Sequence, residues 1–292
     1  MKPSESIFVP VRELRYHCRR WGDPSRPTLF LLHGWMDVSA SFQFLVDALR
    51  GDWHVVAPDW RGFGLTEWAR AGGYWFPDYF ADLEQLLDRF HPGAPATLVG
   101  HSMGGNVATM YAGIRPQRVA RVVNLEGFGL AATEPGQAPR RYARWLDELA
   151  GASPSFRDYE SFDALAERLR ENNPRLDAER ASFLSRHWGR SKPDGRVELA
   201  SDPAHKRVNP VLYRLDEAEA CWRRVEAPVL WVTGAESKTP DMMKLSPQTL
   251  AARKACFSKL AERVIPEAGH MLHHDQPESV ARAIEDFLSD PR

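Results

Sequence analysis

The pentapeptide GHSMG, residues 100–104, lies between an apolar run, Ala96–Val99, and a segment with helical spacing of its apolar residues, Asn106–Ala112. A serine between two glycines, on a sharp turn from strand to helix, presents its hydroxyl as a nucleophile. Glycine suits such a turn because a Cβ would collide with neighbouring backbone. An ordinary glycine-rich loop is the alternative. The flanking pattern and the partner residues described below favour a catalytic Ser102.

Apolar runs typical of strands recur on both sides of this pentapeptide. They lie at Ser6–Val11, Leu14–Arg20, Thr28–Leu32, His54–Ala57, Ala96–Val99, Val119–Leu125, Pro228–Thr233 and Glu262–Ile265. Segments with helical spacing alternate with several of them, at Ser41–Leu49, Tyr79–Phe90, Gly105–Gly113 and Pro277–Leu288. This alternation predicts an α/β fold with a mostly parallel central sheet and helices on both faces.

The alternation stops within residues 128–222. This stretch has helical patterns at Arg140–Ala150 and Phe162–Asn172, and it contains no run typical of a buried strand. We predict a mostly helical cap at 128–222, inserted into an α/β core formed by 1–127 and 223–292. A separate domain or a disordered linker is the alternative, and the many aromatic residues of the stretch argue against disorder.

The composition excludes several classes of protein. The chain has 292 residues, of which 43% are hydrophobic and 26% charged, and its formal net charge is −1. These values favour neither a nucleic-acid nor a membrane-surface partner. Apolar runs are shorter than the roughly 20 residues that cross a bilayer, and the N-terminus lacks the pattern of a signal peptide. Three cysteines without CxxC spacing argue against a disulfide framework and structural zinc. We expect a soluble, cytoplasmic protein.

A serine hydroxyl is a weak nucleophile until a base removes its proton. We assign that role to His270, which follows the last strand-like run and precedes the last helical segment. It also follows Ser102 in chain order, as the base does in enzymes with this type of turn. His273 and His274 lie nearby and are the alternatives. His101 is adjacent to the serine and does not readily reach it in the required geometry.

The third residue of such a set is a carboxylate that orients the imidazole and stabilises its charged form. Its usual position, shortly after the run at 228–233, contains Ser237, which has no charge. Glu126 ends the preceding strand-like run, directly before the predicted cap. We therefore assign the acid to Glu126, with Glu236 and then Asp241 as alternatives. A salt bridge to an arginine of the cap is the non-catalytic role for Glu126.

Two N–H donors are required where negative charge develops on the substrate oxygen. We predict that the backbone N–H of Met103, at the start of the helix, is one donor. The other is assigned to the N–H of Trp35, because Gly34 allows the turn before it to approach closely. The alternative interpretation of Trp35 is that it is a core residue. We expect His33 to hold this loop in place through hydrogen bonds.

The segment DWRGFGLT, residues 59–66, follows the strand-like run that ends near Ala57. Its spaced glycines suit a tight loop at the carboxyl edge of the sheet. We expect Asp59 and Arg61 to fix this loop through polar contacts, and a substrate contact by Arg61 is the alternative.

Several of these segments together resemble the α/β-hydrolase superfamily, over nearly the whole chain outside the cap. They are HGW at 33–35, DWRGFG at 59–64, GHSMGG at 100–105 and GH at 269–270. The region around residues 33–49 is similar to the serine-hydrolase-like branch. The position of Glu126 is similar to the acid position of some haloalkane dehalogenases. Those enzymes and the related epoxide hydrolases use an aspartate nucleophile, so Ser102 disfavours both activities.

The resemblance implies a cap over the active site, and neither a metal nor an organic cofactor. We expect a serine hydrolase that cleaves a carboxylic ester, or a similar acyl bond, of a small apolar substrate through an acyl-enzyme. The alternatives are hydrolysis of carbon–carbon bonds or cofactor-free perhydrolysis with the same residues, and a non-catalytic binding protein of this fold. The sequence assigns neither the physiological substrate nor an oligomeric state.

Overall fold

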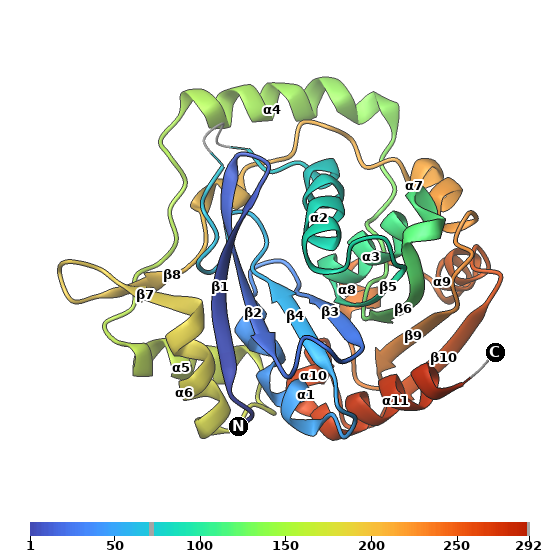
Figure 1. Cartoon of the computed structure of the whole chain (residues 1–292). Helices are drawn as coiled ribbons and strands as arrows, with labels where there is room; N and C mark the ends of the chain where they lie inside the picture. The colour runs from blue at the N-terminus through green and yellow to red at the C-terminus, as the bar shows by residue number, and fades with distance from the viewer. Residues whose placement is uncertain (70–72, 291–292) are drawn as a thin grey trace.

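The computed structural model describes residues 1–69 and 73–290, and its centre is an eight-stranded sheet (Figure 1). The order across the sheet is β1-β2-β4-β3-β5-β6-β9-β10. These strands are β1 (Ser4–Val11), β2 (Leu14–Trp21), β3 (Thr28–Leu32), β4 (His54–Pro58), β5 (Ala96–His101), β6 (Val119–Leu125), β9 (Val229–Gly234) and β10 (Leu260–Ile265). The β1–β2 and β2–β4 pairs are antiparallel, and the pairs from β4 to β10 are parallel. The predicted fold class is confirmed.

Helices cover both faces of the sheet because the central strands bury side chains on both sides. In β3, Leu29 and Leu31 pack on one face, whereas Phe30 and Leu32 pack on the other. The first face is covered by α1 (Gln43–Ala48), α10 (Leu272–Asp275) and α11 (Pro277–Ser289). The second is covered by α2 (Phe76–Phe90), α3 (Met103–Ile114) and α7 (Leu215–Trp222). Two short helices, α8 (Thr239–Met242) and α9 (Pro247–Lys254), follow β9.

The chain between β6 and β9 is mostly helical, as predicted. Its elements are α4 (Ala138–Ala150), α5 (Phe162–Asn172), α6 (Ala178–Trp188), β7 (Gly189–Ser191) and β8 (Val197–Leu199). The last two form a hairpin that the sequence did not indicate, because strands of three residues show no period. Leu165 and Leu184 join α5 and α6 in a small apolar cluster of their own. Phe44 of α1 belongs to the same cluster and joins it to the rest of the protein.

The two ends of this stretch pack very differently. Helix α4 lies across the top of the molecule in Figure 1, and all of its side chains are at least partly exposed. In α7, by contrast, Ala218 and Trp222 belong to the same core cluster as α3. The backbone of α7 also touches α3, since a Cβ at Gly113 would lie 1.8 Å from the Cys221 carbonyl oxygen. The division into a core and a cap at 128–222 stays a prediction.

Most predicted elements agree with the structure to within a few residues. Strands β3 and β6 and helix α5 have the predicted bounds. The segment expected as a helix at Ser41–Leu49 is a 3₁₀ turn at Ser39–Phe42 followed by α1. Within 1–69 and 73–290, the helices are too short or too polar to cross a bilayer.

Candidate active site

The turn from β5 to α3 holds Ser102 in a strained backbone conformation. Its φ angle is +51°, a region that residues with a Cβ rarely adopt and that costs on the order of 1–3 kcal/mol. A Cβ at Gly100 would lie 2.3 Å from the Gly104 carbonyl oxygen, and one at Gly104 would lie 2.0 Å from the Leu32 carbonyl oxygen. Neither glycine therefore tolerates a side chain, as the sequence pattern predicted.

Ser102, His270 and Glu126 form one line of hydrogen bonds. The Ser102 Oγ lies 3.1 Å from Nε2 of His270, and the other ring nitrogen, Nδ1, lies 3.1 Å from Oε2 of Glu126. His270 comes from the loop after β10, and Glu126 directly follows β6. The carboxyl ends of β5, β6 and β10 thus bring together the three residues that the sequence analysis selected.

The Glu126 carboxylate is buried, and besides His270 its partners are the last residue of β9 and the loop that follows. The Gly234 N–H donates to Oε1 at 2.8 Å, and the Ser237 hydroxyl donates to Oε2 at 2.5 Å. Its φ angle of +58° is also unusual for a residue with a Cβ. These contacts differ from the salt bridge to a cap arginine that was the alternative role.

The two alternative acids lie elsewhere in the structure. Glu236 is exposed and pairs with Arg175. Asp241 lies in α8 and is also exposed. The hydrogen bonds around His270 instead include the Thr239 hydroxyl, 3.0 Å from Nδ1. Ser237 and Thr239 were not predicted as parts of the site. Their hydrogen-bond partners are more than 30 positions away in the sequence, so no local pattern reveals them.

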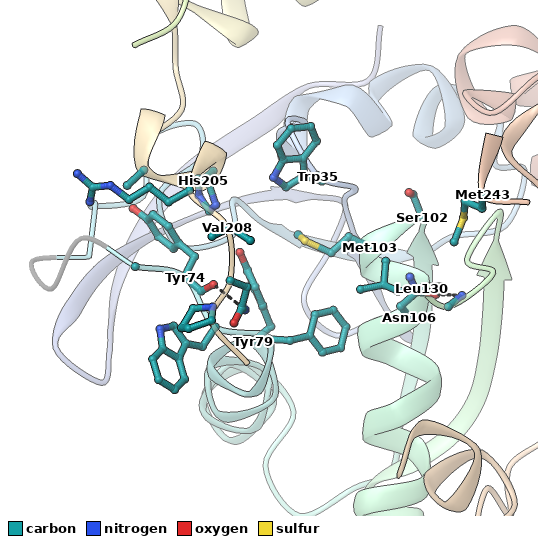
Figure 2. A pocket seen from close by; sticks show the side chains of 18 of the residues that line it. Trp35, Tyr74, Tyr79, Ser102, Met103, Asn106, Leu130, His205, Val208 and Met243 are labelled. Carbon is teal, nitrogen blue, oxygen red and sulfur yellow. Dashed lines mark hydrogen bonds between the residues drawn. The ribbon is translucent and has the colours of Figure 1, made fainter. Parts of the chain in front are cut away.

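The candidate oxyanion donors lie beside the serine. Met103 begins α3, where backbone N–H groups and the helix dipole favour negative charge. The turn at Gly34 approaches the serine closely, since a Cβ at residue 34 would lie 3.3 Å from the Ser102 Cβ. Trp35 and Met103 both line the same cavity as Ser102 (Figure 2).

This cavity has a volume of about 380 Å³ and a strongly aromatic lining. Figure 2 shows Ser102 and Met243 on one side of it, opposite Tyr74, His205 and Val208. Its other aromatic lining residues are Trp35, Trp75, Phe76, Tyr79, Phe128 and Trp145. An enclosure of this size and character suits a small, largely apolar molecule.

The tryptophans of residues 128–222 do not act as a group. Trp145 of α4 lines the cavity, Trp188 packs with the α5–α6 cluster, and Trp222 is in the main core. Much of the aromatic lining comes instead from the segment around Tyr74, which precedes α2. Little in the sequence indicates a role for that segment, because its apolar residues follow no period.

The remaining histidines near the site are buried and hold backbone segments. His33 Nδ1–H donates to the Gly34 carbonyl at 2.7 Å, and its Nε2 accepts from the Trp60 N–H at 2.8 Å. Burial lowers the pKa of His33 to about 4, so the ring is neutral. The Nε2–H of His101 donates to the His270 carbonyl at 2.8 Å.

The loop at residues 59–66 is fixed by buried polar contacts, as predicted. The Asp59 carboxylate accepts from the Ser39 and Leu65 N–H groups and contacts His17 Nδ1 at 2.7 Å. Arg61 donates two hydrogen bonds to Asp82, at 2.6 and 2.7 Å. Arg61 is buried and bound to Asp82, and it is not among the residues that line the cavity.

This sheet topology, combined with a serine on the strand-to-helix turn and an imidazole beside it, defines a serine hydrolase of the α/β type. A family model described as "alpha/beta hydrolase fold" matches residues 27–277. The chain therefore belongs to the alpha/beta-hydrolase family, and it is an enzyme that hydrolyses a small-molecule substrate.

Relatives of known name agree with this membership. A serine hydrolase-like protein of Danio rerio is 30% identical over 96% of this chain and 86% of its own length. A 3-hydroxybutyrate-oligomer hydrolase of Cupriavidus necator is also 30% identical, over 95% of this chain and 93% of its own. The structure of a thioesterase domain from the curacin biosynthetic pathway superposes with a TM-score of 0.87. It covers 97% of this chain and 99% of its own at 23% identity, which establishes the likeness of fold.

Proposed function

We propose that this enzyme hydrolyses carboxylic esters through an acyl-enzyme formed on Ser102. The observation that carries the proposal is the hydrogen-bond line from Ser102 through His270 to Glu126, with 3.1 Å at each step. This line provides a nucleophile, a base and an orienting carboxylate in the arrangement that acyl transfer requires.

In the first half-reaction, Ser102 Oγ attacks the ester carbonyl while His270 Nε2 takes the hydroxyl proton. The carbonyl oxygen becomes an oxyanion, which the N–H groups of Trp35 and Met103 stabilise. His270 then gives its proton to the alcohol oxygen as the C–O bond breaks. Glu126 holds Nδ1–H throughout, and so stabilises the positive charge on the ring.

In the second half-reaction, water takes the place of the departed alcohol. His270 removes a proton from this water as its oxygen attacks the acyl carbon. The oxyanion forms again in the same position, and the bond between the acyl carbon and Ser102 Oγ then breaks. The serine recovers its proton from His270, and the carboxylic acid leaves.

The aromatic lining supports an ester with a small, apolar acyl group. The rings of Trp145 and Tyr79 line the cavity and exclude water from a bound apolar group. The cavity volume of about 380 Å³ limits the size of that group. The Cupriavidus relative is named as a hydrolase of 3-hydroxybutyrate oligomers, which supports including short hydroxyacyl esters among the substrates tested.

The test compares the wild type with Ser102→Ala on chromogenic esters of increasing acyl length. We expect the wild type to favour short to medium acyl groups. The variant should lose at least about 10⁴-fold in kcat, because the nucleophile is absent. Its circular dichroism and melting temperature should match the wild type or improve, since alanine leaves the turn intact.

A fluorophosphonate probe should label the wild type at Ser102, located by peptide mass spectrometry, and leave Ser102→Ala unlabelled. Turnover retained by Ser102→Ala would contradict the assignment of the nucleophile. If the probe labels Ser102 but no ester is cleaved, a panel of vinylogous diketones, and of peroxide with carboxylic acids, tests the carbon–carbon and perhydrolase alternatives.

A further inference from the structure

Three polar side chains lie buried together behind the proposed catalytic residues. They are Asp37, His101 and His273, which are 2%, 1% and 0% exposed. One ligand atom from each lies within 4.8 Å of the ligand atoms of the other two. They come from three distant parts of the chain: the loop after β3, the end of β5, and α10.

The ring of His101 presents a lone pair to this cluster. Its Nε2 lies 2.8 Å from the His270 carbonyl oxygen. A carbonyl can only accept, so Nε2 carries the proton and Nδ1 of the neutral ring is an acceptor. Among residues 1–69 and 73–290, Nδ1 has no hydrogen-bond partner. Metal-binding histidines are commonly held in this way, with the second ring nitrogen donating to a backbone carbonyl.

Asp37 and His273 add further unsatisfied atoms. Asp37 accepts a hydrogen bond from the Val38 N–H at Oδ1. Its Oδ2 has no partner within hydrogen-bond distance in the described ranges, although Ser41 and Trp188 lie close enough to act on the pKa of the carboxyl. Both ring nitrogens of His273 also lack a hydrogen-bond partner among the described residues. Its Nε2 lies 3.9 Å from Asp37 Oδ2. Buried polar atoms are usually paired, so four unpaired ones at one place require a reason.

A hydrogen-bond count does not resolve the cluster internally. Asp37 Oδ2 and His101 Nδ1 both accept, and a neutral His273 has only one N–H to give. While Asp37 is ionised, at least one acceptor within this set of three residues therefore remains unsatisfied. A cation, in contrast, interacts favourably with all three ligand atoms at once.

We propose that Asp37, His101 and His273 form a binding site for a divalent first-row transition metal ion such as Zn²⁺. Two imidazoles and one carboxylate are ligands that zinc accepts, at about 2.0–2.2 Å. The site uses none of the three cysteines. It is therefore distinct from the structural zinc pattern that the cysteine spacing excluded.

Gly34 keeps the approach to His101 open. A Cβ at residue 34 would come within 3.0 Å of His101 Nδ1, so any side chain there would crowd the lone pair. Gly34 thus lies close both to His101 of the proposed metal site and to Ser102 of the active site.

Metal binding at this place inhibits the enzyme. The ligand atoms of a tetrahedral zinc site are roughly 3.4 Å apart, so separations of up to 4.8 Å must shorten on binding. Each ligand is close in sequence to a proposed catalytic group: Asp37 to Trp35, His101 to Ser102, and His273 to His270. Displacing such groups by about 1 Å lowers kcat about 100-fold.

The first measurement is zinc binding to the full chain by equilibrium dialysis, in wild type and in Ser102→Ala. We expect one tightly bound equivalent in both, because the site does not require turnover. Co²⁺ should replace zinc and give visible absorption bands of a four- or five-coordinate ion. The variants Asp37→Asn and His273→Gln should each weaken binding at least about 100-fold, as removal of one of three ligands implies.

Two control variants separate this site from others. His270→Ala removes the proposed base and should retain the bound zinc. His187→Gln removes a half-buried histidine elsewhere and should do the same. Since buried substitutions can unfold a protein, anomalous X-ray scattering at the zinc edge from wild-type crystals locates the ion independently of any variant.

The proposal is overturned if wild type binds no zinc at micromolar concentration, which would mean that a proton or a water serves the cluster. It is also overturned if the anomalous peak lies elsewhere, or if folded Asp37→Asn and His273→Gln bind as wild type does. Ester turnover of the wild type should fall about 100-fold with one equivalent of zinc and return with a chelator. Unchanged turnover of the loaded enzyme would remove the inhibitory role.

Discussion

The two sides of the cavity differ in how firmly the structure holds them. On the sheet side, Ser102, Glu126 and Gly100 are fixed by strained backbone or by contacts that exclude even a methyl group. On the opposite side, α4 contributes Trp145, while Tyr142 and Leu146 of the same helix are 50% and 57% exposed. In the function proposed above, the firmly held sheet side supplies the chemistry, whereas the other side selects which molecule fits.

Glu126→Gln tests the sheet side most severely. The amide cannot stabilise a positively charged His270, and we expect kcat to fall about 10⁴-fold with little change in KM. Glu236→Gln is the matched control and should stay near the wild-type rate, because that residue pairs with Arg175 on the surface. Steady-state kinetics of both variants on one ester test this prediction. A large fall in kcat for Glu236→Gln, with Glu126→Gln near the wild-type rate, would assign the acid role to Glu236.

The double variant Glu126→Gln with Ser237→Asp sharpens the same point. The Ser237 Oγ lies 2.5 Å from Glu126 Oε2, so an aspartate there brings a carboxylate to the edge of the triad. We expect the kcat of the double variant to be about tenfold higher than that of Glu126→Gln alone, which corresponds to ~1.4 kcal/mol. No recovery in a folded double variant would mean that the acid must lie at the position directly after β6.

Acid conditions should weaken the packing on the side of the cavity opposite Ser102. His205 stacks on Phe63, at 3.9 Å between ring centroids, and on Tyr74, at 3.6 Å. Burial lowers the pKa of His205 to about 3, below the value of about 6.5 that an unfolded chain has. The unfolded state therefore binds more protons between these values, and stability is complete above pH 6.5 and declines toward pH 3.

The expected decline is about 1.4 kcal/mol per pH unit for His205. His33 and His274 act in the same direction, since burial lowers their pKa values to about 4 and about 3. Urea unfolding at pH 7, 6 and 5 measures the slope. His205→Gln should reduce it by close to one histidine's share, and an unchanged slope would contradict the pKa of His205.

Trp145→Ala should have the smallest effect. We expect KM for an ester with an aromatic acyl group to rise three- to tenfold, which is ~0.7–1.4 kcal/mol, with kcat unchanged. Tyr142→Ala on the same helix is the control, because its exposed ring is not among the cavity-lining residues. A fall in kcat with constant KM would show that α4 also affects the chemistry.

Patterns of short range were enough to predict much of the molecule. Buried parallel strands and amphipathic helices have periods that a few residues reveal, so β3, β6 and α5 were predicted with their bounds. The turn at Ser102 was recognisable because its steric demands fall on neighbouring glycines. Glu126 was selected for its position at the end of a strand.

Contacts between distant segments were beyond the sequence. Ser237 was dismissed as a residue without charge, although its hydroxyl donates to the carboxylate. The hairpin of β7 and β8 is too short to have a period. The aromatic residues near Tyr74 line the cavity because the chain folds back toward α3, and no local pattern encodes that.

The close contact between α3 and α7 fixes one end of the chain between β6 and β9. Because Gly113 and the Cys221 carbonyl leave no room for even one extra carbon, the α7 end of the inserted stretch is clamped backbone to backbone. Helix α4, with every side chain at least partly exposed, has no comparable clamp among the described residues. The chain between β6 and β9 is therefore held more tightly at α7 than at α4.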